Sequence, residues 1–343
     1  MELINVFDYE MLAEERMDPV HWDFYAGGSD DEVTARANQT DFARVRLRPR
    51  VLIDVSACDM RTSVLGTPVS MPILIAPTAL HCMAHPEGEC ATARGAGAVG
   101  TLMIASTVAT CTLEDIAQAA SGPLWFQLYI YPTREVAAGL VRRAEAAGYK
   151  AIVMTVDLPV LGNRERDRRH KMPIPPAPFV EANLVGVEKT GQEWVPLTWE
   201  TVDWLRSLTS LPIILKGILT AEDALLALEH GVSGIVVSNH GGRQLDSCVT
   251  GIEALPEIVE AVAGRCEVYM DGGIRRGTDI LKALALGARA VLIGRPILWG
   301  LAVNGAQGVQ HVLEILRNEL QLAMKLSGCP TLASIGRSLV KLT

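Results

Sequence analysis

Short apolar runs, rich in β-branched residues, recur along most of the chain. We count eight, at residues 72–76, 101–105, 125–129, 151–156, 212–216, 234–238, 267–271 and 290–294. Stretches rich in alanine and leucine separate most of them, as at residues 133–147, 221–230, 252–263 and 277–286. Strands buried on both faces read as continuous apolar runs, and strands that alternate with helices indicate βαβ units. The pattern therefore predicts a parallel α/β sheet.

Two parallel architectures fit this pattern, an eight-stranded (β/α)8 TIM barrel and an open doubly wound sheet. The eight units fill residues 71–300, close to the length of about 250 residues that is typical of the barrel. No glycine fingerprint of the dinucleotide-binding type follows the first run. We therefore expect the barrel, within one domain that spans residues 1–343.

Three segments lie outside the repeating pattern. Residues 1–65 predict a helical N-terminal extension, with a first helix capped by Asn5 or Asp8 and a second opened by Asp18. Residues 159–198, after the fourth run, are rich in proline and lack a period, which predicts a long lid loop. Residues 307–327 predict a final amphipathic helix.

Composition narrows the class of protein. Of 343 residues, 49% are hydrophobic and 20% charged, as in globular domains with a large core. A net charge of −8 without a long basic run argues against a nucleic-acid surface. The N-terminus lacks a signal-peptide pattern and no apolar run approaches a membrane span. We expect a cytoplasmic protein; a peroxisomal one is the alternative for a eukaryotic source, although the chain does not end in a Ser-Lys-Leu type address.

The seven cysteines are dispersed and include no CxxC pair. Such a set fits a reducing compartment, in which cysteine acts as a small buried hydrophobe. No His, Cys, Asp or Glu cluster has metal-ligand spacing, so we expect no metal.

Polar residues end nearly every apolar run, and in a barrel these ends meet at one mouth. Glutamine, lysine and aspartate at last strand positions (Gln127, Lys216 and Asp271) are costly to bury unless they are paired, which favours a functional site. Glycines and arginines follow the last two strands, where barrels often bind phosphate: Asp271-Gly272-Gly273-Ile274-Arg275 and Gly294-Arg295. A phosphorylated cofactor is therefore implied.

The neutral polar residues at the other ends suit the edge of a flat heteroaromatic ring. They are Ser106, Gln127, Thr155 and Ser238, and they favour a flavin over pyridoxal. Lys216 is open to three roles, as a Schiff-base lysine, a charge partner or a carboxylate clamp.

His240 and Arg243 follow the sixth run, with two glycines between them. A titratable base beside a fixed cation suits removal of a proton from an anion. The plainer reading is a surface loop that happens to contain a histidine.

At this point the chain resembles the FMN-dependent L-2-hydroxy acid oxidase family, from about Phe7 to Gly328. The motifs that carry the resemblance include Ile75-Ala76-Pro77-Thr78-Ala79, His85-Pro86-Glu87-Gly88-Glu89, Phe126-Gln127-Leu128-Tyr129, Thr155-Val156-Asp157, Leu161-Gly162-Asn163-Arg164, Ser238-Asn239-His240-Gly241-Gly242-Arg243-Gln244-Leu245-Asp246 and Gly294-Arg295-Pro296. The subgroup that the chain looks most like is that of the long-chain 2-hydroxy acid oxidases.

The resemblance implies a role for each residue. His240 would be the base, oriented by Asp157, with Lys216 beside the flavin. Arg164, Arg243 and Tyr129 would bind the substrate. The residues that would line the flavin ring are Pro77, Thr78, Ala79, Ser106, Gln127, Thr155 and Ser238. Those that would hold the ribityl chain and phosphate are Asp271, Gly272, Gly273, Ile274, Arg275, Gly294 and Arg295.

The same resemblance implies oxidation of 2-hydroxy acids to 2-oxo acids, with O2 as acceptor and hydrogen peroxide as product. Whether His240 takes the hydroxyl proton or the Cα proton stays open.

Phe24 and Val108 replace a tyrosine and a tryptophan of the glycolate oxidases, so we expect lactate or longer aliphatic chains to be preferred over glycolate.

Other readings remain. One is a dehydrogenase that passes electrons to a quinone or cytochrome, and another is a non-catalytic flavin-binding module. The intact set of His240, Asp157, Arg164 and Arg243 argues against the module. The resemblance also suggests a homo-oligomer, a tetramer or octamer.

Overall fold

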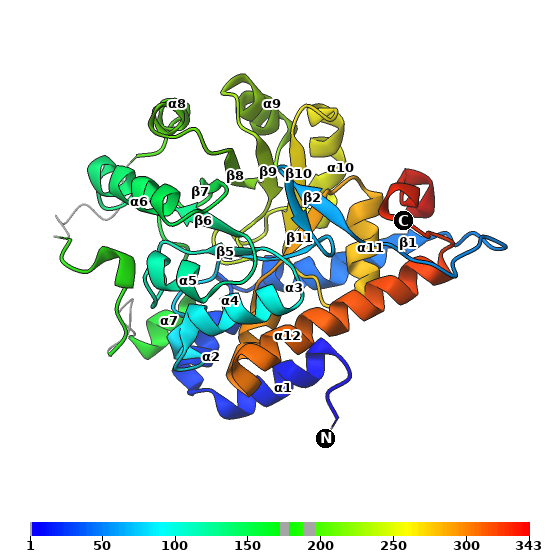
Figure 1. Cartoon of the computed structure of the whole chain (residues 1–343), viewed down its shortest axis with the longest axis horizontal. Helices are drawn as coiled ribbons and strands as arrows, with labels where there is room; N and C mark the ends of the chain where they lie inside the picture. The colour runs from blue at the N-terminus through cyan, green and yellow to red at the C-terminus, as the bar shows by residue number, and fades with distance from the viewer. Residues whose placement is uncertain (1, 172–177, 188–195) are drawn as a thin grey trace.

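The computed structural model describes residues 2–171, 178–187 and 196–343, and its centre is a closed barrel of eight parallel strands (Figure 1). The strands are β4 (Ile73–Ile75), β5 (Met103–Ala105), β6 (Leu124–Leu128), β7 (Ile152–Thr155), β8 (Ile213–Ile218), β9 (Gly234–Val237), β10 (Glu267–Asp271) and β11 (Ala290–Ile293). β11 pairs with β4, with Val291 opposite Ile73, and this pairing closes the ring. The barrel prediction is confirmed, and the open sheet is excluded.

Helices surround the strands. They are α4 (Gly88–Ala98), α5 (Leu113–Ala119), α6 (Arg134–Ala146), α8 (Trp199–Leu208), α9 (Ala221–Glu229), α10 (Gly251–Val262), α11 (Gly277–Ala285) and α12 (Arg295–Leu326). Threonine caps stop several of them from fraying at their starts: Thr133 caps α6 and Thr220 caps α9, each accepting a bond from a backbone N–H three residues on.

The interior of the barrel is filled with side chains and closed at its N-terminal end. Trp125 and Tyr269 meet edge to face, with ring centroids 5.6 Å apart. A hairpin of β2 (Thr62–Val64) and β3 (Thr67–Val69) covers the bottom, where Val64 and Val69 join the apolar interior. Because this end is plugged, a ligand must enter from the C-terminal ends of the strands.

The N-terminal extension comprises α1 (Val6–Arg16), α2 (Pro19–Ala26), α3 (Val33–Thr40) and the 3-10 turn η1 (Asp41–Arg44). Asn5 caps α1 and Asp18 caps α2. α1 packs along α12, and β1 (Val45–Leu47), which follows the N-terminal helices, pairs antiparallel with the C-terminal strand β12 (Val340–Leu342) (Figure 1).

The predicted lid loop is partly helical. It contains α7 (Glu165–His170) and the 3-10 turn η3 (Ala182–Leu184), while residues 172–177 and 188–195 of that prediction lie outside the described residues. α7 is held on α2 by Asp23, which pairs with Arg166 at 3.1 Å and with His170 at 2.7 Å. The sequence of α7 shows no helical pattern of apolar residues, because the helix is held by ion pairs and not by an apolar stripe. The prediction of a loop without helices was therefore wrong here.

The C-terminal helix starts earlier than predicted. α12 begins at Arg295, directly after β11, and its backbone breaks at Asn304 and Gly305 before the segment that the sequence predicted. In the sequence, Gly294-Arg295-Pro296 resembles a loop, although proline is well placed in the first turn of a helix.

Among the described residues, no helix is long and apolar enough to cross a membrane.

Candidate active site

A cavity of about 540 Å³ opens at the C-terminal mouth of the barrel. Eighteen of the predicted site residues line it: Phe24, Pro77, Thr78, Ala79, Ser106, Val108, Tyr129, Arg164, Lys216, His240, Arg243, Asp271, Gly272, Gly273, Ile274, Arg275, Gly294 and Arg295. Four others, Asp157, Gln127, Thr155 and Ser238, lie outside this lining, where three of them bond to residues that line it. The fold thus gathers segments that are up to 271 positions apart in sequence.

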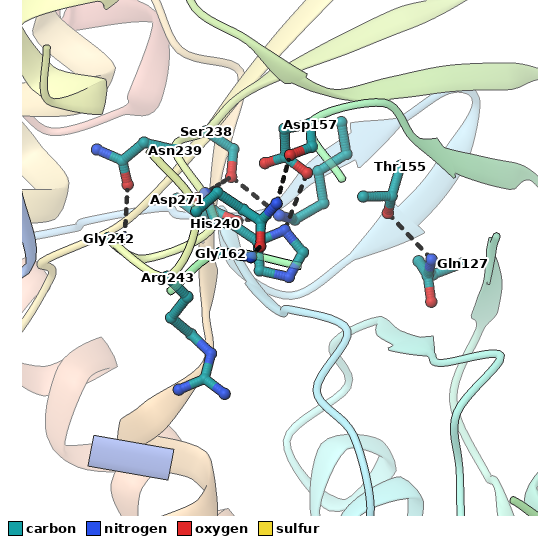
Figure 2. A network of polar contacts seen from close by, with 12 residues as sticks. Gln127, Thr155, Asp157, Gly162, Ser238, Asn239, His240, Gly242, Arg243 and Asp271 are labelled. Atoms are coloured by element: carbon teal, nitrogen blue, oxygen red, sulfur yellow. Dashed lines mark hydrogen bonds and ion pairs between the residues drawn. The ribbon is translucent and has the colours of Figure 1, made fainter. Parts of the chain in front are cut away.

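His240 and Asp157 form a pair at the ends of β9 and β7. His240 Nδ1 lies 2.9 Å from Asp157 Oδ1, and Figure 2 shows the imidazole directed at the carboxylate. The backbone of His240 is left-handed (φ 59°), and its N–H donates to Ser238 Oγ at 3.1 Å. A β-region backbone would continue the strand, so this turn is what aims the ring at Asp157.

The two groups are poised as a neutral base and an ionised partner. Burial lowers the pKa of His240, and Lys216 and Arg164 lower it further, against the opposing effect of Asp157. Burial raises the pKa of Asp157, but its interaction with His240, which includes a hydrogen bond, and the charge of Lys216 outweigh burial, so this pKa lies below its usual value. An ionised Asp157 accepts a hydrogen bond from the Nδ1–H of His240, so the lone pair is on Nε2. The pair can therefore accept a proton from a ligand.

Lys216 supplies a buried cation at the base of the cavity. Its Nζ donates to Ser238 Oγ at 2.9 Å and lies 3.1 Å from Asp271 Oδ2. Burial opposes its charge, but Asp271 and Asp157 outweigh burial and raise the pKa of Lys216 above its usual value. A bulge in β8 follows at Gly217, where a Cβ would lie 2.6 Å from Asp157 Cβ. Glycine is required there because Asp157 takes the space.

Two arginines, Arg164 and Arg243, also line the cavity. Arg243 donates to the carbonyls of Phe24 (2.6 Å) and Gly27 (2.9 Å), while Arg164 donates to Arg243 O at 3.3 Å. Burial and mutual repulsion lower the pKa of Arg243 well below its usual value, and burial lowers that of Arg164. A site that holds several cations against their repulsion is built for an anionic ligand.

Arg295 and Arg275 extend this positive surface toward the ends of β10 and β11. Arg295 donates to the carbonyls of Tyr25, Gly27 and Gly241, so part of its role is to hold the N-terminal extension at the mouth. Arg275 lies over the Trp299 ring, 4.6 Å from its centroid. Burial lowers the pKa of each to about 10.

The chemistry of this wall fits a phosphorylated flavin. Among the described residues, Arg275 Nε and Asp271 Oδ1 are buried without a hydrogen-bond partner, a donor and an acceptor available to a ligand. Gly272, beside them, has a positive φ of 96°, which presents backbone to the cavity. Gly273 has a different reason to be glycine, since a Cβ there would lie 1.7 Å from the carbonyl oxygen of Asn38 in α3.

Gln127 acts from behind the cavity wall. Its Oε1 accepts from Ser106 Oγ at 3.1 Å and its Nε2 donates to Thr155 Oγ1 at 3.0 Å, the second bond being drawn in Figure 2. This chain of bonds orients Ser106, which does line the cavity.

Two kinds of site residue were missed by sequence reasoning. Apolar ones line the cavity without any chemical signature, among them Leu158, Leu161 and Leu298. Gln244 is a tether: its Oε1 accepts from Gly162 N at 3.1 Å, and its Nε2 donates to the carbonyls of Asp157 (3.0 Å) and Val160 (2.9 Å). It lies next to Arg243 in a motif, but nothing in the sequence shows that it holds the segment after β7.

Comparison with known proteins adds to this geometry. Residues 13–342 match the model of the family described as FMN-dependent dehydrogenase. An L-lactate oxidase from Nostoc is 50% identical over 99% of this chain and 98% of its own, and a glycolate oxidase from Spinacia oleracea is 49% identical over 98% and 95%. A solved mandelate oxidase superposes with a TM-score of 0.94 at 45% identity, over 99% of both chains.

Proposed function

Because the chain belongs to the FMN-dependent dehydrogenase family, we propose that it oxidises (S)-2-hydroxy acids to 2-oxo acids and passes the electrons to O2, forming hydrogen peroxide. The observation that carries the proposal is the contact of His240 Nδ1 with Asp157 Oδ1 at 2.9 Å, beside a cavity lined by His240, Arg164 and Arg243. Burial lowers the pKa of His240, which favours the neutral base that the reaction needs. The names of the relatives, which are oxidases of lactate, glycolate and mandelate, support the same reaction class.

FMN is the cofactor of the family, and in this cavity it would supply a two-electron acceptor for the substrate. Arg275, Gly294 and Arg295 would hold its phosphate end. Thr78, Ser106 and Lys216 would line its ring, where the Lys216 cation would stabilise negative charge.

The residues of the chain divide the remaining work. Arg164 and Arg243 bind the substrate carboxylate through charge-assisted hydrogen bonds and so fix its orientation. Tyr129, whose hydroxyl stays protonated because burial and Asp157 raise its pKa to about 12, donates to the substrate. His240 Nε2 takes a proton from the substrate, and Asp157 stabilises the imidazolium that forms.

The substrate end of the cavity favours apolar chains. Phe24 offers no hydroxyl, and its ring lies under Arg243, 5.1 Å from Cζ. Tyr25 does not replace the missing group, since its hydroxyl donates to the carbonyl of Leu80 at 2.7 Å. Val108 and Leu161 add an apolar wall. We therefore propose a preference for lactate or longer aliphatic 2-hydroxy acids over glycolate.

Oxygen uptake with glycolate, L-lactate and 2-hydroxyoctanoate tests the preference. A buried methylene contributes about 0.8 kcal/mol, so kcat/KM should rise about fourfold per added carbon until the cavity is full. Val108→Trp should remove the gain for the longest acid and spare lactate, whereas Val180→Ala, on the exposed part of the lid, should change neither. Glycolate as the best substrate would contradict the assignment.

The electron acceptor is tested separately. After anaerobic reduction by substrate, the flavin absorbance should return rapidly in air. Slow return in air, with fast return on adding a quinone or cytochrome, would show a dehydrogenase and not an oxidase.

A further inference from the structure

The loop that follows β9 and carries His240 rests on helix α3 of the N-terminal extension. We call residues 238–248 the base loop. Gly242 of this loop packs directly on the helix, since its φ is positive at 75° and a Cβ there would lie 2.5 Å from Ala35 N. Its carbonyl also accepts from Ser29 N at 2.9 Å, ahead of α3. The base loop and the N-terminal extension are therefore in close backbone contact.

A pair of buried asparagines fixes one end of the base loop. Asn38 Nδ2 donates to Asn239 Oδ1 at 2.9 Å, and Asn239 Nδ2 donates to Asn38 Oδ1 at 2.8 Å. The two residues are 2% and 4% exposed. Asn239 Oδ1 also accepts from Gly242 N at 3.1 Å, a bond drawn in Figure 2, and Asn239 Nδ2 donates to Val249 O at 3.2 Å. Because a buried amide is costly to leave unpaired, the reciprocal pair holds Asn239 in one orientation.

The start of the helix holds the other end of the base loop. The carboxylate of Asp246 accepts from the first two backbone N–H groups of α3, at 3.1 and 2.7 Å. Glu32, the N-cap residue, makes no such bond itself, so the base loop supplies the cap. The Thr34 hydroxyl accepts from Cys248 N at 3.2 Å. The helix thus contacts the loop on both sides of His240.

The contact at Asn38 is the one that bears on the candidate base. Asn239 directly precedes His240, whose left-handed backbone (φ 59°) aims the ring at Asp157. A residue with a Cβ adopts this conformation at a cost, so its neighbours must hold it there. The carbonyl of Asn239 accepts from Gly242 N at 3.1 Å across this turn, and Asn38 fixes the side chain of the same residue.

We propose that Asn38 is a positioning residue for the candidate base, because through Asn239 it holds His240 in the turn that brings Nδ1 to Asp157. α3 would then serve the site without lining the cavity. The inference rests on the proposed function for its effect on the reaction rate. Its effect on the contact between the imidazole and the carboxylate is a property of the folded chain.

Asn38→Leu is the first test, because leucine has nearly the size of asparagine and no hydrogen-bonding group. The backbone of Asn38, on which Gly273 packs, is unchanged, so FMN should stay bound one to one. In anaerobic stopped-flow reduction, the rate constant at saturating L-lactate should fall roughly 10- to 100-fold, since small misplacements of a reacting group are this costly. The apparent Kd for lactate should change little, because Arg243 keeps its bonds to backbone carbonyls of the N-terminal extension.

Thr34→Val is the matched control. Thr34 lies on the same face of α3, one turn before Asn38, and valine keeps its shape. The substitution removes two bonds to the backbone of Cys248, at 3.2 and 3.4 Å, near the far end of the base loop. We expect both variants to lower the midpoint of urea unfolding, and Asn38→Leu alone to slow flavin reduction.

Proton NMR of the oxidised holoenzyme reads the contact itself. The Nδ1–H of His240, held by Asp157, should give a far-downfield resonance that is assigned by its loss in His240→Gln. This resonance should shift upfield or broaden in Asn38→Leu and stay in place in Thr34→Val. Asn38→Ala, which leaves space for a water beside Asn239, should show the effects of Asn38→Leu in weaker form, and it carries the test if the leucine variant does not fold.

Equal rates and equal resonances in the Asn38 and Thr34 variants would overturn the proposal, since α3 would then only stabilise the fold. A slower Asn38 variant with an unmoved His240 resonance would also overturn it, because the loss would not pass through the base. If the wild-type holoenzyme is reduced by no 2-hydroxy acid, the proposed function fails, and the resonance alone then decides this inference.

Discussion

Replacing Asp157 by asparagine tests how the candidate base works. The substitution keeps the size of the side chain and removes the charge that lies beside His240, with Nδ1 and Oδ1 2.9 Å apart. When His240 takes a proton, the imidazolium and the carboxylate become opposite charges with centres about 4 Å apart. At an effective dielectric constant of about 20 their attraction is about 4 kcal/mol. The variant should therefore reduce its flavin about 10³-fold more slowly.

The assay is anaerobic stopped-flow reduction of the FMN-loaded protein by L-lactate, followed as loss of flavin absorbance. The surface pair of His230 and Asp203 has nearly the same geometry, at 2.8 Å, so Asp203→Asn is the matched control and should leave the rate unchanged. Since Asp157 raises the pKa of His240, its loss should also move the acid limb of the pH–rate profile to lower pH. A loss of less than tenfold, with an unmoved acid limb, would refute the reasoning.

Three further substitutions test the surroundings. Arg243→Lys keeps the positive charge but loses the two-pronged hydrogen bonding of the guanidinium. A hydrogen bond to a charged group contributes about 1.5–3 kcal/mol, so KM for the substrate in steady-state oxygen uptake should rise roughly 10- to 150-fold while FMN stays bound. An unchanged KM would show that Arg243 does not bind the substrate carboxylate. Lys216→Met leaves Asp271 buried without a cation, so urea unfolding should show a loss of about 3–5 kcal/mol, and wild-type stability would contradict the pairing. Glu89→Gln should cost about 1–3 kcal/mol at neutral pH. Burial raises the pKa of Glu89, but His81 and the hydrogen bonds from Thr110 outweigh burial and hold this pKa below its usual value. The extra stability of the wild type over Glu89→Gln should therefore be fully present above the usual carboxyl range and should disappear as the pH falls through the lowered pKa. Melting temperatures of both proteins, measured against pH, test this.

Much of the architecture could be predicted because a parallel barrel leaves a simple pattern. Strands buried on both faces appear in the sequence as short apolar runs. The polar residues at their C-terminal ends must then lie together, because these ends meet at one end of the barrel. Lys216 and Asp271 were placed at such ends from the sequence, and the structure brings Nζ within 3.1 Å of Oδ2. The helices α7 and the first part of α12 escaped, because ion pairs and a Gly-Arg-Pro start carry no apolar period.

Contacts between loops could not be predicted in this way. Gln244 reaches Gly162 across 82 positions, and its partners are backbone atoms that leave no trace in the sequence. Cys82 and Cys111 look unrelated in the sequence, which led to their interpretation as separate buried hydrophobes. Their sulfur atoms lie within 4.8 Å of each other and of a carboxylate oxygen of Glu89, because the segments after β4 and β5, neighbouring strands of the barrel, come together beside α4.

The central claim is that His240 is the base that allows a 2-hydroxy acid to reduce the flavin. Its most direct test is anaerobic mixing of the His240→Gln holoenzyme with L-lactate, with bound FMN quantified beforehand. We predict that the variant binds FMN one to one and that the flavin stays oxidised, while the wild type bleaches under the same conditions. Reduction of the variant at a rate close to that of the wild type would contradict the account.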